Sequence, residues 1–139
     1  MRGARRRCVA LAVGVGAGHH GGVVGVGRVY DERDGESRRV LVDRLWPRGM
    51  RKDDARIDEW LPAVAPSSEL RRWYAHRAEV YDEFVHRYEA ELEQGEQADA
   101  FARLAAVVEH EPTTLVTSTR EVALSHLPVL ARLLDEGSA

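Results

Sequence analysis

The stretch Val40-Leu41-Val42-Asp43-Arg44-Leu45-Trp46-Pro47-Arg48-Gly49 decides the fold of this chain. A short apolar run passes directly into charged, aromatic and backbone-breaking residues. Because Val40, Leu41 and Val42 are apolar at successive positions, both faces of a strand here would be buried, as in an interior parallel strand. Pro47 lacks an amide donor and Gly49 lacks a side chain, so the strand cannot continue past them. The stretch therefore predicts a buried strand over 40–45 that ends in a binding loop.

Strands and helices alternate around this stretch. The hydrophobic periodicity predicts strands at 23–30, 40–45 and 113–117, and helices at 67–75, 78–93, 97–110 and from about 125 to 136. Segment 51–66 is open between a short helix and a short strand around Trp60, because Pro62 and Pro66 confine any helix to a turn or two. This alternation predicts a small Rossmann-like, three-layer α/β domain with a mostly parallel sheet flanked by helices.

Local signals set several element ends. Ser67 or Ser68 is a good N-cap for the helix that follows Pro66. Ser125 is the expected cap of the last helix, with His126 in its first turn, because Pro128 is tolerated only near a helix start. Asp34-Gly35 is expected to form the turn between the first two strands.

The length of 139 residues corresponds to a single domain, expected over 23–136. Residues 1–22 combine a basic start with a Gly-interrupted apolar segment and are expected to be a disordered extension or a mis-annotated start. That segment is too short to span a bilayer, so no membrane association is expected. Cys8 is the only cysteine, which excludes an intrachain disulfide and suits a reducing cytoplasm.

The charge is unevenly distributed along the chain. Residues 1–28 contain five arginines and no acid, whereas the remainder has 15 basic and 23 acidic residues, a formal charge of −8. A body this acidic repels a phosphate backbone, which disfavours nucleic acid as the main partner. Within 38–56, however, basic residues outnumber Asp43, Asp53 and Asp54. The local field around the opening stretch is positive and favours a small anionic partner.

The candidate site combines two loops that follow parallel strands, since ligands of such sheets bind beyond the carboxyl ends of the strands. One loop is Asp43 to Gly49 and the other is Thr117 to Glu121. Arg44 and Arg48 offer planar guanidinium groups for a phosphate or carboxylate. Further donors are expected from Thr117, Ser118, Thr119 and Arg120.

Four residues have two interpretations each. Asp43 either pairs with an arginine or caps a loop, or it moves a proton or contacts the ligand. Trp46 either covers the sheet edge or stacks on a ligand. His126 is either a hydrogen-bonded core residue or faces an anion as a catalytic group. His76 is either a partner of the helix dipole or an acid or base of the site.

Other chemistry has little support in the sequence. No HExxH motif, CxxC pair or calcium loop indicates a metal site, and the Gly-x-Ser-x-Gly elbow, the Walker A sequence and a GxGxxG run followed by a helix are all missing. The sequence identifies neither a cofactor nor an oligomeric state.

The chain closely resembles the YeaO-like proteins, the family of domain of unknown function 488, and the resemblance covers about residues 26 to 135. It rests on the VDRLWPRG run together with Arg28-Val29-Tyr30-Asp31, Trp60-Leu61, Ala65-Pro66-Ser67, Glu69-Leu70-Arg71-Arg72-Trp73, His76, Phe84, Tyr88, Glu91-Leu92 and Thr114-Leu115. The resemblance implies a Rossmann-like fold in a bacterial cytoplasmic protein, but no settled activity.

The family pattern marks a set of positions as its signature: Asp43, Arg44, Trp46, Pro47, Arg48, Trp73, His76 and His126. One departure lies after the late strand, where relatives typically have a tyrosine followed by small residues. This chain has Thr117 at that point, which implies a wider and more polar pocket if the family tyrosine lines the site.

The leading hypothesis is a protein that binds a small anionic or nucleotide-like ligand at the rim formed by 43–49 and 117–126, with the question of catalysis open. In a catalytic version Asp43 or His126 moves the proton. The alternative is a non-enzymatic regulatory or interaction module in which the Trp46 and Arg48 region contacts protein or nucleic acid. Metal-assisted hydrolysis is a third possibility.

Overall fold

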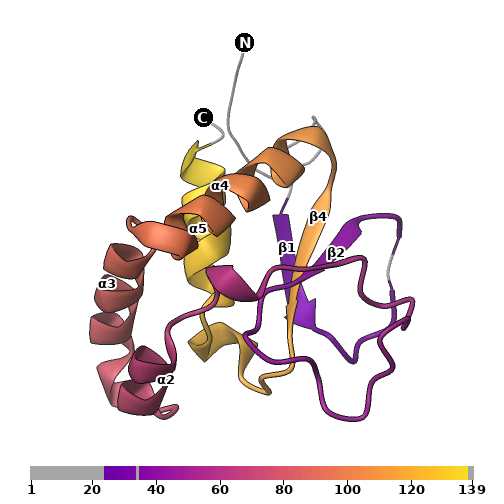
Figure 1. The fold of residues 1–139 in the computed structure, drawn as a ribbon. Coiled ribbons are helices and arrows are strands. Elements are labelled where there is room, and N and C mark those ends of the chain that lie inside the picture. Colours follow the sequence, from indigo (N-terminus) through magenta and orange to yellow (C-terminus); the bar gives the residue numbers. More distant parts are fainter. Residues whose placement is uncertain (1–23, 34, 138–139) are drawn as a thin grey trace.

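A computed structural model of the chain describes residues 24–33 and 35–137 (Figure 1). The expectations for residues 1–22 and for Asp34 in the first turn fall outside this range. At the other half of that turn, Gly35 has a φ of 80°, a left-handed conformation that glycine adopts without strain.

The sheet consists of four parallel strands in the order β1-β4-β2-β3. Their bounds are β1 Val24–Arg28, β2 Arg38–Leu41, β3 Glu59–Trp60 and β4 Thr113–Thr117. The predicted α/β class and parallel sheet are confirmed, and β2 is an interior strand as expected. Regular pairing of β2 ends at Leu41 rather than at 45, although Val42 still donates to the carbonyl of Val116 at 3.2 Å. Trp60 lies in a short strand, so the strand interpretation of segment 51–66 is correct there.

The helices follow the predicted order with small shifts. They are α2 Ser68–Tyr74, α3 Tyr81–Glu91, α4 Gly95–His110 and α5 Leu127–Gly137, with short 3-10 turns η1 Pro62–Val64, η2 Ala78–Val80 and η3 Val122–Leu124. Ser67 is the N-cap of α2, and its hydroxyl accepts from the Leu70 amide at 3.0 Å. Gly95 begins α4, two residues before the start predicted at 97, with a φ of 58°.

The helices cover one face of the sheet (Figure 1). Val40, Val42 and Leu115 point to this face and are fully buried against Tyr88 and Leu104. Side chains at alternate positions of a strand point to opposite faces, so Leu41 and Val116 point the other way. The opposite face packs against Trp46, Met50, Ile57 and Trp60. The third layer of the domain is therefore the long loop between β2 and β3, not a second set of helices.

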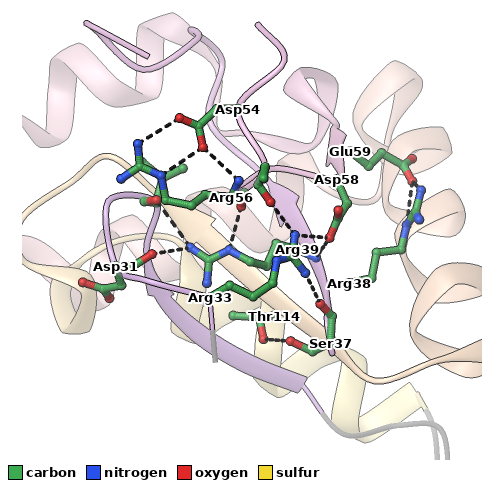
Figure 2. Close-up of polar contacts among 12 residues, drawn as sticks. Asp31, Arg33, Ser37, Arg38, Arg39, Asp54, Arg56, Asp58, Glu59 and Thr114 are labelled. Atoms are coloured by element: carbon green, nitrogen blue, oxygen red, sulfur yellow. Dashed lines mark hydrogen bonds and ion pairs between the residues drawn. The ribbon is translucent and has the colours of Figure 1, made fainter. Parts of the chain in front are cut away.

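Arginine side chains fasten this loop to the sheet (Figure 2). Arg39 is 4% exposed, and its guanidinium donates to the carbonyls of Arg56 at 2.6 Å and Asp31 at 3.1 Å. Its amide donates to the Asp58 carboxylate at 2.8 Å, and Arg33 donates to the same carboxylate at 2.8 Å. Burial opposes ionisation of Asp58, but these donors outweigh it, so the pKa of Asp58 lies below its ordinary value. The charged groups of this network find their partners within the protein, and their hydrogen bonds hold the loop in place.

In the described part of the chain, no helix has the length and apolar character needed to cross a membrane.

Candidate functional site

The carboxyl ends of β1, β2 and β4 lie at one edge of the parallel sheet. The loops that follow them, 28–31, 42–50 and 117–126, form what we call the carboxyl-end rim. The structure thus brings the two loops predicted from the sequence side by side and adds the loop after β1.

Asp43 links two of these loops. The hydroxyl of Thr117 donates to Asp43 Oδ1 at 2.6 Å, and Ser118 donates to Oδ2 through its amide at 2.8 Å and its hydroxyl at 3.0 Å. The Asp43 side chain is 12% exposed. Both carboxylate oxygens are therefore engaged by the β4 loop, and the pairing partner is a set of hydroxyl and amide donors rather than an arginine.

The His126 ring lies beside the Asp43 carboxylate. Its Nε2 is 2.8 Å from the carbonyl of Val42 and 3.6 Å from Asp43 Oδ1. A carbonyl only accepts, so Nε2 must carry the proton. Burial lowers the pKa of His126 below its ordinary value, although Asp43 and the bond to Val42 oppose the shift. The His126 ring also makes a T-shaped contact with the ring of Tyr88. His126 precedes α5 by one residue instead of lying in its first turn, and the Ser125 hydroxyl accepts from the amide of Leu127, the first residue of the helix, at 3.1 Å.

Arg44 and Arg48 diverge and do not form a joint clamp. Arg44 donates to the carbonyls of Ala65 at 2.8 Å and Pro66 at 3.4 Å, and its buried Nε has no partner among the described residues. Arg48 is exposed, and its guanidinium makes no hydrogen bond or ion pair within 24–33 and 35–137, although its carbonyl accepts from Tyr30. Backbone carbonyls before α2 thus hold the guanidinium of Arg44, whereas that of Arg48 is exposed.

Arg44 also lines a hollow of about 470 Å³. The other lining residues are Ala63, Ser67, Ser68, Gln94, Gly95, Glu96 and Gln97. Of the lining residues, Arg44 alone belongs to the carboxyl-end rim, so the hollow adjoins the rim at this side chain.

Arg28 is a rim residue that the sequence analysis missed. It ends β1, donates to the carbonyl of Ser118 at 3.2 Å and lies 5.0 Å from the ring centroid of Tyr30. Its Nε is buried without a partner in the described chain. The signal was present, because Arg28 lies near the carboxyl end of the strand predicted at 23–30. Arg71 was also missed, and its positive charge contributes to lowering the pKa of His126.

The remaining predicted residues are placed as follows. Trp46 is partly buried and packs on the loop-covered face of the sheet, with its Nε1 donating to the carbonyl of Met50 at 2.8 Å. Arg120 is exposed and unpaired among the described residues. His76 is exposed in the turn after α2 with a φ of 59°, and its ring lies 6.3 Å from that of Tyr74. Trp46 therefore packs on the sheet, Arg120 lies in the same loop as Ser118, and His76 lies in the turn after α2, outside the three rim loops.

Within the residues that the structure describes, no group of three or more His, Cys, Asp or Glu side chains is arranged to hold a metal ion.

The fold and the rim define a small parallel α/β protein with a carboxylate enclosed at the strand ends. The family described as "Inactive DUF488-N3 subclade" matches residues 23–139, and the chain belongs to it. Two similar relatives are the uncharacterized protein Rv3073c of Mycobacterium tuberculosis and Mb3100c of Mycobacterium bovis, each 50% identical over 113 residues, which is 81% of this chain and 93% of theirs. The protein YeaO of Escherichia coli is 42% identical over 105 residues, or 75% of this chain and 90% of its own. No solved structure matches the chain.

Proposed function

We propose that the protein binds a small anionic or nucleotide-like ligand at the carboxyl-end rim, without chemical turnover, in the bacterial cytoplasm. The observation that carries this proposal is that arginines at the rim and arginines elsewhere differ in whether a carboxylate pairs with them. Away from the rim, most arginines of the described chain are ion-paired with carboxylates: Arg33, Arg38, Arg51, Arg56, Arg87, Arg103 and Arg132. At the rim, Arg28, Arg48 and Arg120 have no carboxylate partner among the described residues.

Unpaired guanidinium groups on neighbouring loops favour an external anion. Arginine presents a planar set of donors that matches phosphate and carboxylate oxygens. Arg28 retains an unpartnered Nε, and Arg48 and Arg120 are exposed. In an otherwise acidic body, these three residues are cations at the strand ends that remain available to a small anion.

Catalysis by Asp43 or His126 has less support than binding. Asp43 accepts hydrogen bonds from Thr117 and Ser118 on both oxygens, which lowers its availability as a base. His126 directs its Nε2 proton to a backbone carbonyl, and both side chains are nearly buried. The word "inactive" in the family description agrees with a non-enzymatic role.

Thermal unfolding with inorganic phosphate and with adenosine monophosphate tests this proposal, against sodium chloride at equal ionic strength. Wild-type protein should be stabilised specifically by one or both anions. Arg48→Ala and Arg120→Ala should lose most of that stabilisation while keeping the unfolding temperature of the free protein. Arg51→Ala is the matched control, because Arg51 lies in the same loop but is 85% exposed and paired with Asp53. Equal stabilisation of all variants, or none in the wild type, would contradict the proposal.

A non-enzymatic interaction module is the second candidate, and one observation favours it. Leu45 is 67% exposed and Tyr30 is 37% exposed, and both lie on loops of the rim next to Arg48. Exposed aromatic and basic side chains together suit single-stranded nucleic acid. Oligonucleotide binding that weakens steeply with salt and requires both Tyr30 and Arg48 would replace the small-ligand proposal.

A further inference from the structure

Trp46 and Trp60 form an aromatic corner on the loop-covered face of the sheet. Their ring centroids are 5.4 Å apart, and the ring planes meet at 72°. Both indole N–H groups are anchored, Trp46 to the carbonyl of Met50 and Trp60 to the carbonyl of Asp43, each at 2.8 Å. The two rings, which we call the tryptophan corner, are therefore fixed in position by the backbone around them.

A cation occupies this corner in the structure. The ammonium of Lys52 lies 5.1 Å from the Trp46 centroid and 5.3 Å from the Trp60 centroid. Lys52 is exposed, is the only lysine of the chain, and makes no hydrogen bond or ion pair with the described residues. Among the described residues, the faces of these two rings are thus the contacts that this charge makes.

Nearby carboxylates do not account for the position of Lys52. Asp53 is paired with Arg51, and Asp54 is bound by Arg56 through both carboxylate oxygens. The carboxylates of Asp53 and Asp54 are therefore already neutralised by Arg51 and Arg56. Neither of them is left to attract Lys52. The attraction of the ring faces for a cation explains the contact.

We infer that the tryptophan corner is a cation-binding site for methylated ammonium groups, and that Lys52 is its internal occupant. A lysine ammonium is strongly hydrated, so the attraction that holds an exposed lysine on two ring faces is weak enough for another cation to displace it. A quaternary ammonium cannot donate hydrogen bonds to water and matches the same faces with a smaller desolvation cost. A ligand or partner that carries such a group displaces Lys52 without rearranging the rings. The inference does not depend on anion binding at the rim.

Titration with tetramethylammonium chloride, followed by the indole N–H resonances of ¹⁵N-labelled full-length protein, tests the inference. The resonances of Trp46 and Trp60 should move in a saturable manner. Trp73 is the internal reference, because its ring is covered by Arg77 and Arg87 and lies outside the corner. Sodium chloride at the same ionic strength is the salt control.

Removal of the internal occupant sharpens the test. Lys52→Ala should bind tetramethylammonium roughly two- to fivefold more tightly than the wild type, because the competing charge is lost. Lys52→Arg should keep the competition and bind like the wild type. If the Trp46 and Trp60 resonances of folded Lys52→Ala respond no differently to tetramethylammonium than to sodium, or if all three indoles shift alike, the corner is not a cation site.

Discussion

The hydroxyl of Thr117 donates a 2.6 Å hydrogen bond to the carboxylate of Asp43, joining the end of β4 to the end of β2. The Ser118 amide and hydroxyl complete the contact on the second carboxylate oxygen. The hydroxyl and amide donors of the β4 loop thus surround a carboxylate of the protein itself. Donors in this arrangement are also suited to bind a free anion. Asp43 therefore acts first as a structural link between the strand ends.

Asp43→Ala should destabilise the protein by about 2–3 kcal/mol, because the Thr117 hydroxyl and the Ser118 amide are left without an acceptor in a nearly buried site. Urea denaturation measures the loss. Asp53→Ala is the control, since the Asp53 side chain is 75% exposed and its removal should change stability by less than about 0.5 kcal/mol.

Formate should restore part of the stability lost in Asp43→Ala. The small carboxylate fits the vacated donors and binds the folded state only, which raises its stability by mass action. The readout is the unfolding midpoint of the variant at increasing sodium formate, compared with sodium chloride and with wild-type protein. Equal responses of variant and wild type would show that the donors are not a carboxylate cradle.

The pKa of His126 implies that stability falls on mild acidification. The folded-state pKa is lowered below the ordinary value of 6.5, mainly by burial, so the unfolded chain binds the extra proton first. The contribution of neutral His126 is fully present above pH 6.5 and is lost as the pH falls toward the folded pKa. Denaturation curves between pH 8 and pH 5 should show this slope, and His126→Gln, which retains a donor for Val42, should flatten it. If stability depends on pH as steeply in His126→Gln as in the wild type, the effect belongs to another histidine.

The main architecture was predictable from the sequence because it depends on local patterns. Thr113–Thr117 forms a strand with the predicted bounds, since its β-branched residues follow a proline that ends the preceding helix. Two buried parallel strands then place their following loops at one edge, which brings Thr117 to Asp43. The N-cap at Ser67 was likewise set by its immediate neighbours.

The directions of long side chains were not predictable, because their partners are distant in sequence. Arg44 contacts carbonyls about 20 positions away, and nothing near it signals those acceptors. Arg39 reads as a surface residue beside Arg38, yet it is buried against a loop whose path depends on the whole fold. The loop that covers the second face of the sheet was not predictable either, because a loop has no periodic signal. The contact between Lys52 and Trp60 depends on the path of this loop, so it could not be predicted from the sequence.

The turn after α2 contains backbone strain that glycine should relieve. Ala75 and His76 have φ values of 46° and 59°, in the left-handed region that costs a non-glycine residue about 1–2 kcal/mol. Ala75→Gly should therefore raise the free energy of unfolding by about 0.5–1 kcal/mol, as measured by urea denaturation. Ala90→Gly, in the exposed surface of α3, should lower it by a similar amount. If Ala75→Gly destabilises instead, contacts of the alanine methyl outweigh the strain.

Arg39 should control the loop layer more than the global fold. Its guanidinium donates to backbone carbonyls of Arg56 and Asp31, so Arg39→Met leaves several acceptors unpaired under the loop. The packing of the helical face does not involve this residue, because that cluster lies on the other side of the sheet. Hydrogen exchange should therefore accelerate at amides of 43–58 while those of α4 change little. Arg51→Ala, which removes only an exposed pair, should leave both rates near the wild type. A uniform acceleration in α4 and the loop would mean that the loop and the core unfold as one unit, and that Arg39 stabilises the whole domain.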